Sequence, residues 1–277
     1  MNRNQPFSVS MCVYGGDDPA HFDAAIASII DQTVPPNEIV LTVDGPIPKE
    51  IQAVIDRYAA APDGVALRTV YLPRNMGHGE ARRASINACT NDLIALMDAD
   101  DLSVKTRFER QLDFFSANPD LSAVGGNISE FIDTPEDCVG RRIVPQTDAE
   151  IKAYMKKRCP MNQVSVMFRK KDIEAVGGYI DWYCEEDYYL WIRLCLAGYK
   201  FGNVPENLVS VRVGSEMYRR RGGIKYFRSE ARLQAYMLKK GLIHLPRFLI
   251  NVSERLIMQV LLPNRVRGFL FQKLARK

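Results

Sequence analysis

The sequence predicts an α/β protein with a mostly parallel central sheet, helices on its faces and a helical tail at its C-terminal end. Over the first 100 of the 277 residues, apolar strand-like runs alternate with segments of helical periodicity. Flexible or acidic residues follow each of these runs, at the edge where open parallel sheets bind ligands. From residue 224 the chain is helix-like and basic.

The expected strands of the first half are apolar runs, each followed by turn-forming or acidic residues. They are residues 7–14, 38–43, 65–72 and 93–97. The segments between them repeat apolar side chains every three or four positions, which is typical of amphipathic helices. They are residues 20–32, 48–61 and 79–89. This order favours right-handed crossovers between parallel strands.

The second half is less regular. Its helix-like segments are residues 105–117, 148–157 and 185–197. Its strand-like segments are residues 122–131, 163–169 and 208–213, the first of them interrupted by two glycines. We expect residues 1–235 to form the folded domain and residues 236–277 to form a basic, amphipathic helical tail.

The composition is that of an ordinary globular protein, with 47% hydrophobic and 25% charged residues. No apolar run reaches the ~18 residues that a membrane-spanning helix needs, and the N-terminal segment lacks the apolar core of a signal peptide. The six cysteines form no C-x-x-C pair and match no zinc pattern. We therefore expect reduced thiols and a cytoplasmic location.

The formal net charge of +4 hides an uneven distribution. Residues 212–277 carry 16 Lys and Arg against 3 Glu, whereas residues 1–211 carry 21 Lys and Arg against 30 Asp and Glu. A basic tail on an acidic body favours contact with an anionic partner, such as phospholipid, nucleic acid or a phosphorylated substrate. A solvated helix face explains the same charges equally well.

Three carboxylates follow the strand at residues 93–97, in the order Asp98-Ala99-Asp100-Asp101. Such a cluster needs a cation or several donors to offset its charge repulsion. Mg²⁺ or Mn²⁺ would supply that charge, with water and phosphate oxygens completing its ligand shell. The alternative is helix capping by Asp101 or Ser103, which leaves two acids unexplained.

Two further clusters carry charge. Glu185, Glu186 and Asp187 begin an expected helix, where the helix dipole favours acids. A carboxylate held there can also accept a proton from a substrate hydroxyl. Residues 219–221 are three arginines followed by two glycines, which suits phosphate recognition, although a basic surface loop has the same composition.

Other nucleotide-binding folds are not favoured. Neither G-x-G-x-x-G nor G-x-x-x-x-G-K-[ST] occurs, which argues against a Rossmann dehydrogenase and a P-loop kinase. His21, His78 and His244 are too far apart to form a local zinc motif. Aromatic stacking motifs for RNA are absent, so we expect no nucleic acid as a partner.

Several phrases of the sequence, in their order, resemble family 2 glycosyltransferases. They are CVY at residues 12–14, SIIDQT at 28–33, DG at 44–45, RNMG at 74–77, AR at 81–82 and MDADD at 97–101. The last of these stands where the family has its D-x-D motif. The resemblance covers about residues 7–235 and is greatest to bacterial enzymes that build capsule, O-antigen or exopolysaccharide.

The resemblance implies a GT-A fold, with a donor-binding half at about residues 1–101 and an acceptor half at about residues 102–235. It implies a nucleotide-sugar donor that contacts Val13, Tyr14, Asp44, Asn75, Arg82, Asp98, Arg220 and Arg221. Asp98 and Asp100 would hold Mn²⁺ or Mg²⁺ on the diphosphate. Asp187 would be the catalytic base of an inverting transfer, with Glu186 beside it.

The resemblance also implies a UDP-sugar donor and a glycan acceptor, commonly one linked to a polyprenyl diphosphate lipid. The tail, in which Val266, Phe269 and Leu270 share a helix face, would then lie on the inner face of the cell membrane. Packing of the tail on its own domain or in a dimer is the alternative. Two other functions stay open: a sugar-phosphate nucleotidyltransferase and a non-catalytic membrane-surface or scaffold protein.

Overall fold

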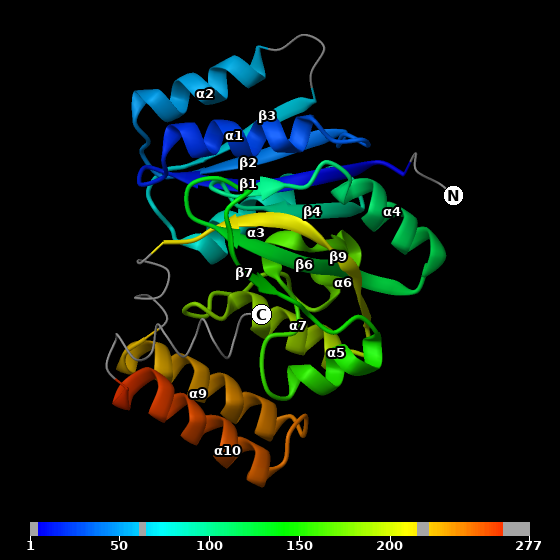
Figure 1. Cartoon of the computed structure of the whole chain (residues 1–277), viewed down its shortest axis with the longest axis vertical. Helices are drawn as coiled ribbons and strands as arrows, with labels where there is room; N and C mark the ends of the chain where they lie inside the picture. Colours follow the sequence, from blue (N-terminus) through cyan, green and yellow to red (C-terminus); the bar gives the residue numbers. More distant parts are fainter. Residues whose placement is uncertain (1–4, 61–64, 215–221, 263–277) are drawn as a thin grey trace.

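The computed structural model describes residues 5–60, 65–214 and 222–262. In these residues a nine-stranded sheet has the order β3-β2-β1-β4-β8-β6-β9-β5, with β7 paired to β6 outside this path. Helices cover both faces of the sheet, and two long helices form an outer layer at one end (Figure 1). The predicted α/β class is confirmed.

The first half contains four parallel strands joined by helices, as predicted. The strands are β1 (Phe7–Tyr14), β2 (Glu38–Asp44), β3 (Ala66–Leu72) and β4 (Leu93–Met97). The helices are α1 (Pro19–Ile30), α2 (Lys49–Ala59) and α3 (His78–Ala88). Every predicted boundary here lies within about two residues of the observed one.

The second half extends the sheet in mixed directions. Its strands are β5 (Leu102–Ser103), β6 (Leu121–Phe131), β7 (Cys138–Arg142), β8 (Met167–Arg169) and β9 (Lys200–Arg212). Its helices are α4 (Arg107–Ala117), α5 (Asp148–Met155), α6 (Lys170–Ala175), α7 (Glu186–Leu196), α9 (Ile224–Lys239) and α10 (Leu245–Leu256), followed by the π-helical turn η2 (Ile257–Leu261). Because β8 is antiparallel to both β4 and β6, the sheet is parallel throughout only as far as β4.

Three predictions for this half are corrected. β6 is not interrupted at Gly125 and Gly126: an added Cβ there would lie 2.5 Å from the side chains of Asn203 and Leu208, so these glycines let β9 approach closely. β9 begins at Lys200 rather than at residue 208. The segment 163–169 is a strand only from residue 167, after a 3₁₀ turn.

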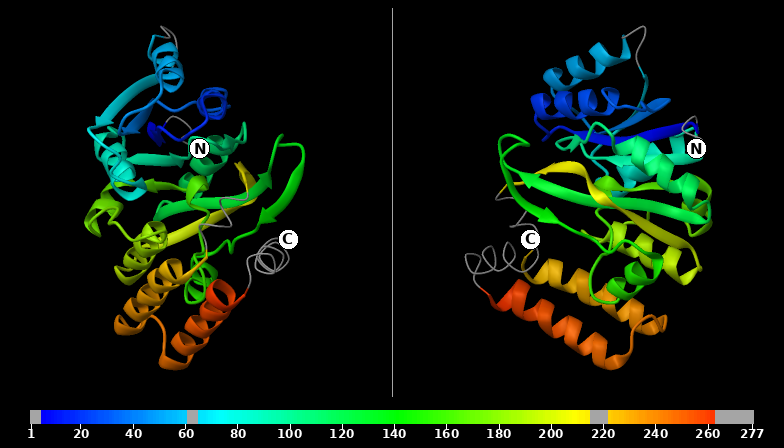
Figure 2. Two further views of the ribbon diagram at one scale, coloured as in Figure 1. Left: turned by 90° about the vertical axis from the view of Figure 1, so that its left-hand side faces the viewer. Right: turned by 45° about the vertical axis from the view of Figure 1, so that its right-hand side comes forward.

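Each face of the sheet has its own hydrophobic core. α1, α2 and α4 pack on one face, with Phe22 and Phe108 among the buried side chains. α3, α5, α7 and α9 pack on the other, where Trp191, Leu233 and Met237 are buried. The predicted division at residue 235 falls inside α9, and α9 and α10 form an antiparallel pair that covers this second core (Figure 2).

We expect Gly45→Ala to lower the free energy of unfolding by about 2 kcal/mol or more, because Gly45 has a φ of 86° and a Cβ there would lie 2.5 Å from the backbone nitrogen of Asn75. Gly198→Ala is the matched control, since Gly198 has a φ of 87° but no atom within 4 Å of the added carbon. We expect Gly198→Ala to lower the free energy of unfolding by about 1 kcal/mol. Equal midpoints for the two variants in urea unfolding would contradict the close approach of Gly45 to the backbone of Asn75.

Candidate active site

The carboxyl ends of β1, β2 and β4 meet at one edge of the sheet, as those of parallel neighbours do. Tyr14 pairs with Asp44 in register, and Asp98 follows β4 directly. The Tyr14 side chain is 46% exposed, whereas that of Val13 lies in the core. The side chain of Tyr14 is therefore accessible and that of Val13 is not, and the contact of either residue with a nucleotide stays a prediction.

Asp44 fixes the loop between β3 and α3. Its buried carboxylate accepts hydrogen bonds from the backbone N–H groups of Met76 at 2.6 Å and Gly77 at 3.1 Å. Asn75 Oδ1 also accepts a bond from the Gly77 N–H, at 3.2 Å. The loop is thereby held beside the end of β2, and the contact of Asp44 with a nucleotide stays a prediction.

Arg82 and Asp98 form an ion pair at the centre of this edge. Arg82 Nη2 lies 2.7 Å from Asp98 Oδ1, and the guanidinium is only 3% exposed, so solvent screens the attraction little. Burial favours the neutral carboxyl, but the charge and hydrogen bond of Arg82 outweigh it and lower the pKa of Asp98. Arg107 adds a second buried positive charge behind β4, where it donates to the Leu96 carbonyl at 2.8 Å.

The other two aspartates of the triplet have different surroundings. Asp101 is buried and accepts a hydrogen bond from the Arg212 N–H at 2.8 Å, which ties it to β9. Burial and the charge of Asp98 raise the pKa of Asp100. The capping alternative is wrong, because α4 begins at Arg107 with Thr106 before it.

The excess negative charge at this edge suits a divalent cation. Burial, together with the charges of Asp100 and Asp98, raises the pKa of Asp17 to about 6. Within residues 5–60, 65–214 and 222–262, no group of three or more His, Cys, Asp or Glu side chains is arranged to hold a metal ion. The roles of Asp98 and Asp100 as ligands of such an ion stay a prediction.

The second acidic cluster lies at the start of α7. Asp187 Oδ1 accepts a hydrogen bond from the Tyr188 N–H at 2.6 Å, and Oδ2 accepts one from the Cys159 thiol at 3.8 Å. Burial, together with the charge of Glu186, raises the pKa of Asp187 to about 6. At neutral pH this side chain is a carboxylate that binds a proton more tightly than an ordinary Asp does.

A histidine without a predicted role joins the two acidic clusters. His78 Nδ1 lies 3.1 Å from Glu186 Oε1, and Nε2 lies 2.7 Å from Arg82 Nη2. Arg82 can only donate, so Nε2 accepts and the ring proton on Nδ1 is donated to Glu186. Glu186, His78, Arg82 and Asp98 thus form one chain of contacts. The only signal in the sequence was the place of His78, directly after the RNMG phrase.

The loop that leads into α7 is held by α9. Ser229 Oγ donates to the Tyr183 carbonyl at 2.6 Å, and the Trp182 indole donates to the Ser229 carbonyl at 3.2 Å. Cys184 in this loop has a φ of 58°, a left-handed conformation that is unfavourable for a residue with a Cβ. The contacts from α9 therefore fix a strained backbone immediately before the acids.

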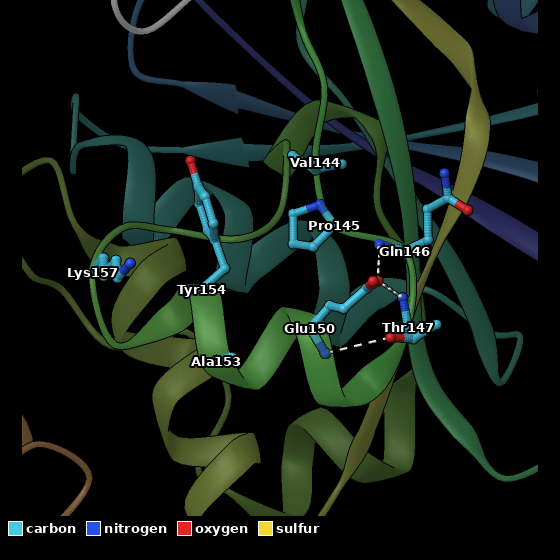
Figure 3. A pocket seen from close by; sticks show the side chains of 8 residues that line it. All are labelled: Val144, Pro145, Gln146, Thr147, Glu150, Ala153, Tyr154 and Lys157. Atoms are coloured by element: carbon cyan, nitrogen blue, oxygen red, sulfur yellow. Dashed lines mark hydrogen bonds between the residues drawn. The ribbon is translucent and has the colours of Figure 1, made fainter.

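A separate hollow lies beside the N-terminus of α5 (Figure 3). It is lined by Val144, Pro145, Gln146, Thr147, Glu150, Ala153, Tyr154 and Lys157. Thr147 and Glu150 are bonded to each other in a capping box there. No residue of the two acidic clusters lines this hollow, nor does His78 or Arg82, so it is not the candidate active site. The predicted ligand residues Arg220 and Arg221 lie outside the described residues.

Comparison with known proteins identifies the family. The Glycosyl transferase family 2 profile matches residues 8–176. The chain belongs to this family. It is 35% identical over 271 residues to the UDP-Gal:alpha-D-GlcNAc-diphosphoundecaprenol beta-1,3-galactosyltransferase of Escherichia coli, covering 98% of this chain and 97% of that protein. It is 32% identical over 276 residues to the amylovoran biosynthesis glycosyltransferase AmsE of Erwinia amylovora, covering 96% and 98%.

The predicted enzyme class is therefore confirmed: the protein is a glycosyltransferase of bacterial polysaccharide synthesis. Similar solved structures include the mannosyltransferase PcManGT from Pyrobaculum calidifontis in complex with GDP-Man and Mn²⁺ (TM-score 0.66, 16% identity, 95% of this chain and 72% of that one). Another is S. aureus TarS 1–349 in complex with UDP-GlcNAc (TM-score 0.67, 15% identity, 97% and 76%). At these identities the likeness concerns the fold alone, and it confirms the predicted GT-A fold.

We expect Ser229→Ala to lower the kcat of the glycosyltransferase about tenfold, because a loosened loop misplaces the acids that follow it. The KM for the donor and the free energy of unfolding should change little, the latter by about 1 kcal/mol. Ser253→Ala, on the exposed side of α10, is the matched control and should keep the full kcat. A kcat of Ser229→Ala equal to that of the control would show that α9 does not position the acids.

Proposed function

We propose that this glycosyltransferase moves a sugar from a UDP-sugar to a lipid-linked glycan, with inversion, in a single displacement. The observation that carries the proposal is the chain of contacts from Asp98 through Arg82 and His78 to Glu186, which sets one acidic cluster beside the other. The chemistry needs a cationic site for the leaving diphosphate and a carboxylate for the attacking hydroxyl. The name of the E. coli relative supports UDP-galactose as the first donor to test and a GlcNAc-diphosphate lipid as the first acceptor.

Asp187 is the proposed catalytic base. Its pKa of about 6 leaves it mostly deprotonated at neutral pH and makes it a better proton acceptor than an exposed Asp. It takes the proton from the acceptor hydroxyl as the oxygen attacks the anomeric carbon, opposite the departing UDP. Glu186, held by His78, is proposed to orient the acceptor through hydrogen bonds to its hydroxyl groups.

The carboxyl edge of the first four strands is the proposed donor site. The Val13 backbone and the side chains of Tyr14, Asp44 and Asn75 surround the place proposed for the nucleoside. Arg82 is proposed to offset charge on the diphosphate, together with Arg220 and Arg221. Three guanidinium groups suit a leaving group whose negative charge increases during the reaction.

Asp98 and Asp100 are the proposed ligands of Mn²⁺ or Mg²⁺. When bound, such an ion offsets the charge that develops on the leaving diphosphate. The raised pKa of Asp100 supports this role, because it marks a carboxylate whose charge lacks sufficient compensation from protein groups. Asp101, bonded to β9, is given a structural role instead.

The proposed lipid-linked acceptor also implies that the enzyme acts at the inner face of the cell membrane. The basic tail at residues 236–277 would then lie on the lipid surface. In the described part of the chain, no helix is long and apolar enough to cross a membrane. Attachment would then be peripheral, through charge and apolar side chains. Residues 263–277, where the sequence predicts an amphipathic segment, lie outside the described residues.

We expect Asp187→Asn to lower kcat by about 10²–10⁴, because the amide cannot accept the proton. In the wild type, kcat/KM should rise tenfold per pH unit below about pH 6 and level off above it, as Asp187 loses its proton. Transfer assays with UDP-galactose over pH 4.5 to 8.5 measure both. Asp181→Asn, in the loop before α7, is the control. Wild-type kcat in Asp187→Asn would contradict the assignment of the base.

We expect UDP to bind the wild type at least tenfold more tightly with Mn²⁺ than with EDTA, and Asp100→Asn to abolish that difference. Isothermal titration calorimetry measures both effects on folded protein. Asp31→Asn is the matched control, because Asp31 is an exposed carboxylate paired with Lys105. Equal UDP binding with and without metal in the wild type would contradict the metal site.

A further inference from the structure

One side of α10 and η2 presents apolar side chains to solvent. We call it the α10 ridge, and its large members are between 36% and 65% exposed. They are Leu245, Leu249, Ile250, Leu256, Ile257, Val260 and Leu261. At helical spacing these positions fall on one broad face together with Pro246 and Ser253, and that face contains no charged residue. An uncharged face of this length is unusual on a surface that meets only water.

The opposite side of α10 is bonded to the domain. The Asn251 side chain is buried and donates to the Lys156 carbonyl at 2.8 Å. Arg255 donates to the Lys157 carbonyl at 2.9 Å and pairs with Glu230 of α9 at 3.0 Å. Rotating the helix to bury the ridge would break all of these contacts. The ridge therefore faces outward as a consequence of the fold, on the outer layer of the molecule (Figures 1 and 2).

The charge around the ridge is positive. Residues 222–262 contain seven Lys and Arg against two Glu, and one of these acids, Glu230, is buried in its pair with Arg255. The exposed basic residues of α9 and the turn after it are Lys225, Arg228, Arg232, Lys239 and Lys240. An apolar face beside exposed cations is complementary to a surface that is apolar inside and anionic outside.

The C-terminal end of the ridge adjoins the candidate active site. The Gly223 N–H donates to the Gln259 carbonyl of η2 at 3.0 Å, which joins η2 to the start of α9. Lys225 of α9 lies 3.9 Å from the centre of the Tyr183 ring, in the loop that precedes the catalytic acids. A surface bound at the ridge would therefore lie near the acceptor side of the site.

We propose that the α10 ridge docks on a bilayer that contains anionic lipid, with its apolar side chains at the boundary of headgroups and acyl chains. The proposal rests on the proposed function, since a lipid-linked acceptor lies in such a bilayer. A second copy of the chain is a less favourable occupant of the ridge, because the positively charged α9–α10 pairs of the two copies would repel each other. Residues 263–277 are also a less favourable occupant of the ridge. They contain five basic residues (Lys and Arg together) and no acid, and the surface around the ridge is already positive.

The test is flotation of the full-length protein with vesicles of phosphatidylcholine alone or with about 30% phosphatidylglycerol. We expect binding only to the anionic vesicles, and a loss of about tenfold in Leu249→Ser/Ile257→Ser. Val139→Ser/Ile143→Ser is the matched control: Val139, on β7, is 52% exposed, and Ile143, just after it, is 58% exposed. This variant should float like the wild type. Unfolding in urea checks that both variants are folded.

Three results would overturn the proposal. Equal flotation of both variants would mean that another surface binds lipid. A dimer in sedimentation that only the ridge variant dissociates, without flotation of the wild type, would identify a second copy as the occupant. Slow hydrogen exchange over α10 that does not change when vesicles are added would identify residues 263–277 as the occupant of the ridge. Transfer to a short-chain, soluble GlcNAc-diphosphate acceptor is assayed in parallel, so that failure of the proposed function is distinguished from failure of docking.

Discussion

The guanidinium of Arg82 is the positive charge on which the arrangement of this site depends. It contacts Asp98 and His78, each at 2.7 Å, and it is almost completely buried. Its charge lowers the pKa of Asp98 and opposes the rise in the pKa of Asp187, one carboxyl group from each acidic cluster. Because an arginine keeps its proton at every pH at which the protein is folded, this compensation does not titrate away. The buried Arg82 thus offsets part of the negative charge where the two acidic clusters approach each other.

The topology explains why these groups meet, although they are far apart in the sequence. Parallel β1 to β4 place the start of α3, with His78, at their carboxyl edge. β8 joins β4 to β6 and is antiparallel to both, so the second half continues the same sheet instead of forming a separate one. The contact between His78 and Glu186 then brings the first turn of α7 to that edge. The candidate active site is therefore formed where the two halves meet.

Much of this arrangement was predictable from the sequence, and the failures have physical reasons. The elements of the first half and both acidic clusters show clear periodicity or clear chemistry. His78 and Ser229 act through hydrogen bonds to other elements, and one polar residue leaves no pattern in a sequence. Arg107 lies at the start of a helix with many polar residues, so nothing indicated that it is buried. The first part of β9 contains Gly, Asn and Pro, which strands usually avoid, and its pairing with β6 overrides that preference.

The carboxylate of Asp187 opposes the stability of the fold. The pKa of Asp187 is about 6, against 3.8 for an ordinary Asp, so between these pH values the folded protein binds a proton more tightly than the unfolded chain does. The contribution of this group to stability therefore falls as pH rises from about 4 to about 6, and above that the loss is complete. The proposed role of Asp187 as a base requires that same deprotonated form.

The strained φ of Cys184 adds to the conformational cost of the loop before α7. Contacts that hold this loop in place come from α9, which is anchored in the second core by Leu233 and Met237. The packing of α9 in this core thus supports the loop that carries the electrostatic and conformational cost of the candidate site.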